Sequence, residues 1–481
     1  MTAAPLWLAN RGVHTGTALP VRDAWSGETI AEVAQAGPDE IERAIAAAYT
    51  ARPAMAALPA WRRRDVLEHL LARVREHAES LAQTITAEGG KPIAAARAEV
   101  ARAQATLREA AAEAGRLDGE ALDLDRDAAT RGWRGFTRRV PAGVASLITP
   151  FNFPLNLVLH KLAPALAAGC PVLLKPAPAT PLTALKLGEW LAECDLPEGA
   201  FSILPCANPH AAPFVEDARI AVLSFTGGLV GWDLKARAGK KRVVLELGGN
   251  AACIVDADPG APLDHVVSRI VSGAYGQAGQ SCISVQRLIV HRAVLPALRD
   301  KLVDAVHAVP QGDPRDPRTV VGPMISAAAA DRLESLIATA IAAGATALVR
   351  GARSDACPSL LGPTLLENVP REHPLYREEA FGPVLMVEAA EDVDHAIERA
   401  NDSRFGLQCG VFTARMDHAM RAWDALDVGG VVIGDVPTVR VDRMPYGGVK
   451  DSGLGREGPR WAMDDFSETR LLVTTGTPGA T

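Results

Sequence analysis

The length and composition of the chain exclude several classes of protein. Its 481 residues are enough for about three domains at roughly 150 residues each. Hydrophobic residues at 48% against charged residues at 22% predict folded units with sizeable cores. The formal net charge of −7 argues against a protein whose main task is to bind nucleic acid or an anionic membrane, although a positive pocket for a small anionic ligand is still allowed.

Targeting and redox signals favour a cytoplasmic protein. No run of apolar residues approaches the roughly 18 that a transmembrane helix needs, and residues 1–10 lack the basic start and apolar stretch of a secretory signal. The seven cysteines are scattered and form no CxxC pair. A disulfide framework and a cysteine-rich zinc site are therefore not expected, no metal site is predicted, and a reducing compartment fits best.

The N-terminal part of the chain predicts helices between about residues 39 and 115. Ala, Arg, Glu and Leu dominate this region, with apolar positions at helical spacing. Proline or glycine is expected to interrupt the helices near Pro53, Pro59 and residues 89–92. The arginines are assigned to solvated faces, without a chemical role. A polar excursion follows over residues 118–139.

From residue 140 the pattern changes to alternating strands and helices. Strands are predicted at 144–148, 171–174, 201–204, 220–225, 243–247, 252–255 and 287–290, and helices at 155–168, 180–194, 264–275 and 294–309. Thr180 and Pro181 are expected to cap and begin the helix over 180–194. Such alternation predicts an α/β fold with parallel sheets, and the restart after Gly248 and Gly249 predicts a second α/β unit.

A cysteine among small residues, in Gly279-Gln280-Ser281-Cys282-Ile283, is a candidate nucleophile. A lone cysteine is more often a small buried hydrophobe, and that interpretation fits the other six. For Cys282 the two interpretations are evenly matched, because glycine and polar neighbours suggest backbone exposed near a cleft.

Glu246 and Asn152 are the next candidates. Glu246 lies at the end of an apolar strand, where partial burial would raise its pKa and suit it to general-base work; a strand-end glutamate in a salt bridge is about equally frequent. Asn152, in Thr149-Pro150-Phe151-Asn152-Phe153-Pro154, offers an amide donor at the carboxyl end of a strand, where parallel sheets bind ligands. A turn-forming asparagine beside proline is, by itself, the more common case.

Three further segments complete the set. Lys175-Pro176 follows one strand, and Phe225-Thr226-Gly227-Gly228 lies at the end of another. Glycines between a strand and a helix can seat a pyrophosphate, although the GxGxxG fingerprint is absent. Glu378-Glu379-Ala380-Phe381-Gly382-Pro383 is by itself typical of an exposed loop.

Together these motifs resemble the aldehyde dehydrogenase superfamily in order and spacing, over nearly the whole chain. PFNFP, KP, FTGG, ELGGN, GQSC and EAFGPV follow the family's order, and the interval from Glu246 to Cys282 is close to the family's usual gap. The tail from Arg440 to Lys450 is similar to the lactaldehyde and phosphonoacetaldehyde branch. The resemblance implies an NAD(P)-dependent, non-acylating aldehyde dehydrogenase with a Rossmann-like cofactor domain, an α/β catalytic domain and a small β oligomerisation flap.

The same resemblance implies a role for each candidate residue. Cys282 would be the nucleophile, Asn152 and the Cys282 N–H would form the oxyanion hole, and Glu246 would activate water to release the acid. The residues implied to bind the cofactor are Thr149, Pro150, Phe151, Lys175, Gly227, Gly228, Leu247, Glu379 and Phe381. Substrate contacts are expected from Phe153, Ser281 and Arg440, although pairing of Arg440 with Asp442 explains that arginine equally well.

Several positions depart from the family pattern. Pro178 stands where many NAD-preferring members carry a glutamate that grips the adenosine ribose, so either NAD or NADP is expected. Gly228 replaces a common serine, and Ser281 lacks the positive charge found there in members that act on phosphorylated aldehydes. Two alternatives to hydrolytic oxidation stay open: a CoA-acylating semialdehyde dehydrogenase and a catalytically silent protein on the same fold.

The resemblance also predicts the domain organisation. The cofactor-binding domain is expected at residues 1–118 and 142–247, the catalytic domain at 248–442 and the oligomerisation flap at 119–141 and 464–478. Residues 471–473 are strand-like with no local partner, which leaves a sheet edge to be covered. The expected partners are a small-molecule aldehyde and further copies of this chain, as a homodimer or homotetramer, with no nucleic acid and no membrane.

Overall fold

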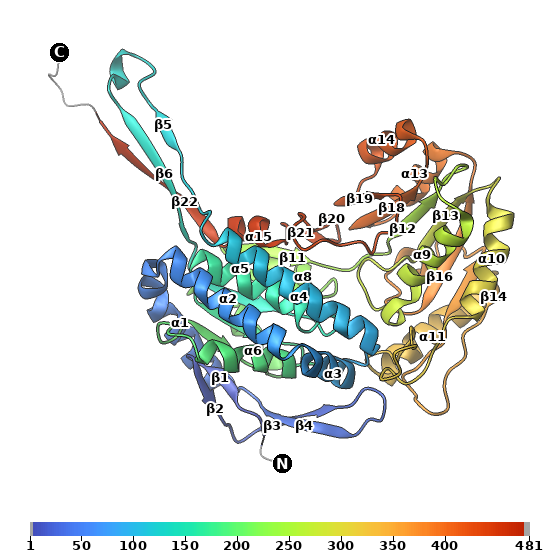
Figure 1. Cartoon of the computed structure of the whole chain (residues 1–481), viewed down its shortest axis with the longest axis horizontal. Helices are drawn as coiled ribbons and strands as arrows, with labels where there is room; N and C mark the ends of the chain where they lie inside the picture. Colours follow the sequence, from blue (N-terminus) through green and yellow to red (C-terminus); the bar gives the residue numbers. More distant parts are fainter. Residues whose placement is uncertain (1–2, 476–481) are drawn as a thin grey trace.

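The structure is a computed structural model that describes residues 3–475. It consists of two α/β units side by side and a narrow arm that projects from the first unit (Figure 1). The N-terminal half of the chain builds the first unit, and most of the C-terminal half builds the second. None of the helices among the described residues is long and apolar enough to cross a membrane.

A sheet of eight strands forms the centre of the first unit. Its order is β2 (Arg11–Val13), β1 (Leu6–Leu8), β9 (Phe201–Ile203), β8 (Val172–Lys175), β7 (Val144–Ile148), β10 (Ile220–Thr226), β11 (Arg242–Glu246) and β21 (Gly453–Leu454). The five strands from β9 to β11 are parallel. Every residue of β7, β8 and β9 is buried, which explains why these strands read as continuous rather than alternating apolar runs.

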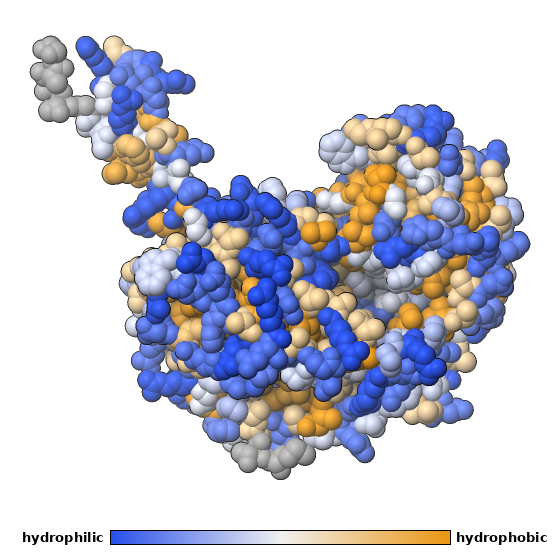
Figure 2. Space-filling view, viewed as in Figure 1, coloured by the Kyte–Doolittle hydropathy of each residue, from blue (hydrophilic) through white to orange (hydrophobic). Residues whose placement is uncertain are grey.

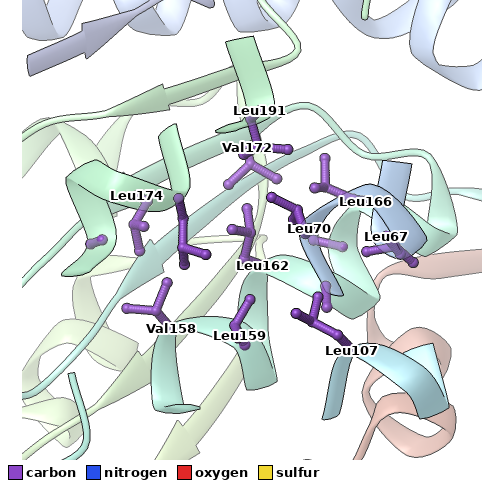
Figure 3. Close-up of a cluster of buried hydrophobic side chains, with 14 of the residues drawn as sticks. Leu67, Leu70, Leu107, Val158, Leu159, Leu162, Leu166, Val172, Leu174 and Leu191 are labelled. Carbon is purple, nitrogen blue, oxygen red and sulfur yellow. The ribbon is translucent and has the colours of Figure 1, made fainter. Parts of the chain in front are cut away.

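Helices pack on this sheet and close its core. They are α1 (Pro38–Ala57), α2 (Ala60–Glu76), α3 (Ala78–Gly89), α4 (Ile93–Glu113), α5 (Asn156–Ala168), α6 (Leu182–Ala192), α7 (Ala212–Glu216), α8 (Gly231–Arg237) and α15 (Pro459–Asp465). Helix α5 is buried on all sides. Figure 3 shows leucine and valine side chains of α5 meeting those of α2, α4, α6 and β8, so the core lies between the sheet and the outer helices.

Two predicted features of these helices are wrong. Pro53 does not interrupt α1 but lies inside it. The carbonyl of Tyr49, which a proline four residues later leaves without its helical donor, accepts a hydrogen bond from Arg52 Nε at 3.0 Å. Thr180 does not cap α6: the backbone N–H of Leu182 instead donates to Glu88 Oε2 of α3 at 2.9 Å, and Thr180 Oγ1 has no partner among the described residues.

The second unit contains a seven-stranded sheet. Its order is β14 (Thr346–Val349), β15 (Thr364–Glu367), β16 (Val384–Ala390), β13 (Arg287–His291), β12 (Ala252–Val255), β18 (Gln408–Phe412) and β19 (Gly430–Ile433), all parallel except β14. The helices of this unit are α9 (Leu263–Tyr275), α10 (Leu295–His307), α11 (Ala327–Ala342), α12 (Pro374–Arg377), α13 (Val393–Asn401) and α14 (Met416–Ala425). The predicted restart near residue 250 therefore begins a separate sheet.

Short strand pairs occupy the periphery. β3 (Ala18–Arg22) pairs with β4 (Thr29–Ala34), and β17 (Phe405–Gly406) pairs with β20 (Val449–Lys450), both antiparallel. The strands and helices predicted between residues 144 and 309 all occur, with ends that differ by no more than two residues.

The arm is a three-stranded antiparallel sheet of β5 (Ala121–Asp123), β6 (Arg134–Pro141) and β22 (Ser467–Thr474). Residues 471–473 have no partner nearby in the sequence, as expected, because β22 pairs along its whole length with β6, at residues 134–141. The far edge of β22 carries no further strand among the described residues. Of the flap segments predicted at 119–141 and 464–478, residues 476–478 lie outside the described part of the chain.

Candidate active site

Two cavities meet at Cys282, between the two α/β units. One has a volume of about 440 Å³ and is lined by residues at the carboxyl ends of β10 and β11 and by the loop before β16. The other, of about 340 Å³, is lined by residues of α4, α5 and α9. The residues shared by both walls are Leu157, Cys282, Arg440 and Tyr446. The surface is hollowed between the two units in the view of Figure 2.

Cys282 lies in a tightly folded loop after α9. Gln277 and Ala278 have φ angles of 55° and 54°, in the left-handed region that non-glycine residues seldom adopt. At Gly279 (φ 65°) a Cβ atom would lie 2.2 Å from the carbonyl oxygen of Gly382, so only glycine fits. The loop presents a half-buried thiol whose Sγ lies 3.0 Å from the Tyr446 hydroxyl. Burial raises the pKa of this thiol to about 12.

Asn152 is fixed against the same loop. Its Nδ2 donates to the backbone carbonyl of Gln280 at 3.0 Å, and the backbone carbonyl of Asn152 accepts from Gln277 Nε2. A side-chain amide carries two N–H donors, so one is left free, and Asn152 lines the larger cavity together with Cys282. The loop and the strand end that bear the two residues are thereby joined.

Glu246 ends β11 and lines the larger cavity. It is buried, and neither of its carboxyl oxygens has a hydrogen-bond partner among the described residues. The salt bridge considered for this residue is likewise not found within residues 3–475. Burial, reinforced by the nearby Glu457 carboxylate, raises the pKa of Glu246 well above its ordinary value. A cavity-facing carboxyl group in this state is suited to accept a proton.

Most of the residues expected to bind a cofactor line the larger cavity. They are Pro150, Phe151, Gly227, Gly228, Leu247, Glu379 and Phe381. The rings of Phe151 and Phe381 meet edge to face, with centroids 5.9 Å apart. Glu379 Oε1 accepts from the Gly249 backbone N–H at 3.1 Å, and burial raises the pKa of this carboxyl group to about 7.

Thr149 and Lys175 do not line that cavity but lie beside it. They end the neighbouring strands β7 and β8, and the Thr149 N–H donates to the Lys175 carbonyl at 3.2 Å. Lys175 Nζ donates to Asn208 Oδ1 at 3.2 Å and has further donors free for a ligand. Burial lowers the pKa of this ammonium group. Pro178 lines a separate cavity of about 640 Å³ next to the β3–β4 turn.

The three residues expected to contact substrate, Phe153, Ser281 and Arg440, all line the smaller cavity. Of the two interpretations of Arg440, the pairing with Asp442 is wrong. Arg440 Nη2 instead donates to Glu457 Oε2 at 2.9 Å, and its Nε has no partner among the described residues. Glu457 is buried and also accepts a hydrogen bond from Lys161 Nζ at 2.9 Å, so this one carboxylate pairs with two cations. These two cations overcome the opposing effect of burial and lower the pKa of Glu457 to about 2.

Two residues of the cavity walls were not expected from the sequence. Arg102 of α4 lines the smaller cavity and donates to Asp442 at 2.8 Å, and His160 of α5 lies 2.8 Å from the same carboxylate. The available signal was the Glu99 and Arg102 pair on one face of an alanine-rich helix, next to the apolar positions of that helix. The second unexpected wall residue is Tyr446. It lies in the tail from Arg440 to Lys450, and the sequence assigned it no role.

The structure thus brings a thiol, a buried carboxyl group and a side-chain amide together where two cavities meet. The chain belongs to the aldehyde dehydrogenase family, whose profile matches residues 11–472. General aldehyde oxidation follows from this membership.

Three known aldehyde dehydrogenases are similar to this chain over nearly its whole length. A 3-sulfolactaldehyde dehydrogenase of Priestia aryabhattai is 38% identical over 461 residues, covering 95% of this chain and 95% of the relative. This similarity agrees with the resemblance to the lactaldehyde branch. Aldehyde dehydrogenase 21 from Physcomitrella patens, solved in complex with the reaction product succinate, is 44% identical with a TM-score of 0.97 and covers 99% of both chains. An NADP-dependent glyceraldehyde-3-phosphate dehydrogenase from Bacillus halodurans, solved with NADP, is 32% identical with a TM-score of 0.94 and covers 99% of this chain and 100% of the other.

Proposed function

We propose that this protein oxidises a short aldehyde bearing an anionic group to its carboxylic acid, through a covalent bond to Cys282 and hydrolysis assisted by Glu246. The observation that carries this proposal is the meeting of two cavities at one thiol. The unpaired carboxyl group of Glu246 faces one cavity, and two guanidinium groups face the other.

The first step is attack of the Cys282 thiolate on the aldehyde carbon, which gives a thiohemiacetal. The oxygen becomes negatively charged as the C–S bond forms. The free N–H of the Asn152 amide and the backbone N–H of Cys282 are the donors proposed to hold it. Each donor of this kind is worth about 2.7–4 kcal/mol in the transition state.

The cofactor proposed for the larger cavity is NAD or NADP, whose nicotinamide ring, when bound, accepts the hydride of the aldehyde carbon. The cavity fits such a group: the space beside Gly228 is open, and a Cβ on Gly248 would lie 2.3 Å from Glu379 Oε2, so backbone approaches this carboxylate closely. Thr226 Oγ1 is buried without a partner among the described residues. Glu379 and Phe381 are proposed to hold the nicotinamide ribose and ring, and Lys175 the other ribose.

Hydrolysis of the resulting thioester is assigned to Glu246. Its carboxylate takes a proton from a water molecule as the water attacks the acyl carbon, and the acid and the Cys282 thiolate are released. This role separates the proposal from a CoA-acylating enzyme, which needs no base at this position. It also separates it from a silent protein, because Cys282, Glu246 and Asn152 are all retained around one space.

The anionic group of the substrate is inferred from the smaller cavity. Arg102 and Arg440 line it, whereas their carboxylate partners Asp442 and Glu457 do not. Each guanidinium has five N–H donors and uses only part of them on its partner. Arginine is the side chain best matched to carboxylate, sulfonate or phosphate oxygens. The relatives named above act on or yield compounds with such groups, which supports the same class.

The substrate class is tested with two four-carbon aldehydes that differ only at the far end. One is the semialdehyde whose oxidation gives succinate, and the other is butanal. We expect wild-type kcat/KM to favour the semialdehyde. Arg102→Met is expected to lower kcat/KM for the semialdehyde by about 10–100-fold, or about 1.4–2.7 kcal/mol, and to leave butanal within about threefold.

Arg97→Gln is the matched control, since Arg97 lies on the same helix and pairs with Glu79 at the surface. This variant is expected to leave kcat/KM unchanged for both aldehydes. Equal losses for both aldehydes in Arg102→Met, or a wild-type preference for butanal, would contradict the anionic substrate while leaving aldehyde oxidation itself intact.

A further inference from the structure

The hydroxyl group of Tyr446 lies at the centre of the active site in a fixed position. Its backbone N–H donates to the Glu457 carbonyl at 3.0 Å, and its buried ring packs with Ile283 and Leu407. The Arg440 guanidinium lies over the ring, 3.7 Å from its centroid. Because these contacts fix both the backbone and the ring of Tyr446, its hydroxyl group has little freedom to leave this position.

This hydroxyl contacts the reacting sulfur. Tyr446 Oη lies 3.0 Å from Cys282 Sγ, and within residues 3–475 no other side chain is within hydrogen-bond distance of that sulfur. When the thiol is neutral, either group can donate. Once the sulfur has lost its proton, only the phenol can donate, because a thiolate has no hydrogen to give.

We propose that Tyr446 is a further catalytic residue, whose hydroxyl donates a hydrogen bond to the Cys282 thiolate and thereby favours the attacking form of the nucleophile. The inference rests on the proposed role of Cys282 as the nucleophile. Tyr446 keeps its own proton throughout, and the proton lost by the thiol passes to solvent water and not to the phenol.

The electrostatic surroundings explain why such a donor matters. Burial opposes ionisation of Cys282, and the carboxylates of Glu379 and Glu246 oppose it as well. Arg440 and the Tyr446 hydroxyl act in the other direction. These are the charged or titratable groups facing the sulfur, from β11, the loop before β16 and the segment after β19. Tyr446 is the one that makes a direct hydrogen bond, and bonds to an ionised partner are among the strongest in proteins.

The test is the pH dependence of Cys282 alkylation by iodoacetamide in Tyr446→Phe, without substrate. Modification is followed by mass spectrometry of the peptide that contains Cys282, so the other cysteines do not interfere. Because phenylalanine keeps the ring and removes only the hydroxyl, we expect the alkylation rate at each pH between 7 and 9 to fall about tenfold. This is the loss of thiolate that a rise of one unit in the thiol pKa gives below the midpoint, or about 1.4 kcal/mol.

Tyr376→Phe is the matched control. It removes a tyrosine hydroxyl that bonds Glu388 Oε1 at 2.8 Å, and it should leave the alkylation profile unchanged. Cofactor binding and circular dichroism verify that both variants are folded; if Tyr446→Phe is not, Tyr446→Trp, which also removes the phenol, takes its place. Profiles of the Tyr446 variant and the wild type that superimpose would overturn the proposal. Alkylation of Cys282 that left aldehyde oxidation intact would instead overturn the proposed function.

Discussion

Cys282 differs from the other six cysteines by its position and not by its side chain. It alone lines the two cavities, whereas Cys253 and Cys409 lie fully buried in the sheet of the second unit. The glycine and polar neighbours that distinguished it in the sequence are the residues that fold its loop, with Gly279 against the Gly382 carbonyl. The sequence could therefore distinguish Cys282, the proposed nucleophile, because residues that fold its loop are its neighbours in the chain.

Replacement of single cysteines separates chemistry from packing. Cys282→Ala is expected to abolish aldehyde oxidation while NAD or NADP still binds, because the residues proposed to hold the cofactor come from other loops. Cys253→Ala should keep its turnover per folded molecule and lose stability by about 0.5–3 kcal/mol, the usual range for a point mutation. Steady-state kinetics, cofactor titration and urea unfolding measure the three quantities. Turnover in Cys282→Ala, or its loss in folded Cys253→Ala, would identify a different sulfur as the nucleophile.

The residues that sequence patterns missed have partners far along the chain. Arg102 meets Asp442 across 340 positions, and Tyr446 meets Cys282 across 164. On its alanine-rich helix the pair of Glu99 and Arg102 on one face was the available local signal, and it does not indicate a partner 340 positions away. The same distance explains the incorrect pairing of Arg440, because a neighbour two residues away was visible in the sequence and Glu457 with its Lys161 partner was not.

At the scale of elements, helix and strand periodicity predicted the sheets but not the contacts at helix ends. Helix α6 begins at Leu182, two residues after its predicted start, and its first N–H group is satisfied by Glu88 of α3. Pro53 is accommodated because a side chain replaces its missing donor. Both solutions depend on side-chain contacts that residue-type preferences do not contain. The short strands β1 to β4 were also not predicted, since segments of three to six residues carry little periodicity.

The Glu88 contact predicts a pH-dependent stability. Burial raises the pKa of Glu88 to about 8 in the folded protein. Between the ordinary glutamate range and that value, the folded protein keeps a proton that the unfolded chain releases, so this group lowers stability as pH rises through the interval. In Glu88→Gln, urea unfolding between pH 5 and 8 should show a smaller fall in stability, by up to about 1.4 kcal/mol per pH unit.

Glu88→Ala tests the helix-capping contact separately. It leaves the Leu182 N–H without its acceptor and is expected to cost about 1–3 kcal/mol more than Glu88→Gln, which keeps an acceptor oxygen. Equal stabilities of the two variants would show that the contact contributes nothing, and an unchanged pH profile in Glu88→Gln would show that this carboxyl group does not titrate as stated.

At the scale of the whole molecule, the arm carries apolar side chains that would be exposed to water if the protein were a monomer. Phe136, Leu471 and Leu472 are 48%, 53% and 60% exposed, and Figure 2 shows hydrophobic residues along the arm. Within the described residues, no strand pairs with the outer edge of β22, which leaves its backbone groups available to another chain. We propose that the arm joins copies of this chain, as the flap was expected to do.

Sedimentation of the purified protein at micromolar concentration tests this role. The wild type is expected to sediment as a dimer or tetramer, and Leu472→Lys as a smaller species, because a charge on the arm would have to be buried in the interface. Trp423→Lys is the control, since Trp423 is 64% exposed on α14 of the second unit, far from the arm in Figure 1. A wild-type monomer, or an assembly unaffected by Leu472→Lys, would contradict an oligomerising arm.

The central claim, covalent oxidation at Cys282 followed by hydrolysis through Glu246, is tested most directly by the first turnover of Glu246→Gln. With excess aldehyde and cofactor, rapid-mixing absorbance should show a burst of about one reduced cofactor per site and then a slow steady rate. Mass spectrometry of the quenched protein should find the acyl group on the peptide containing Cys282. Steady turnover at the wild-type rate, or a burst that leaves no acyl group on Cys282, would contradict the account.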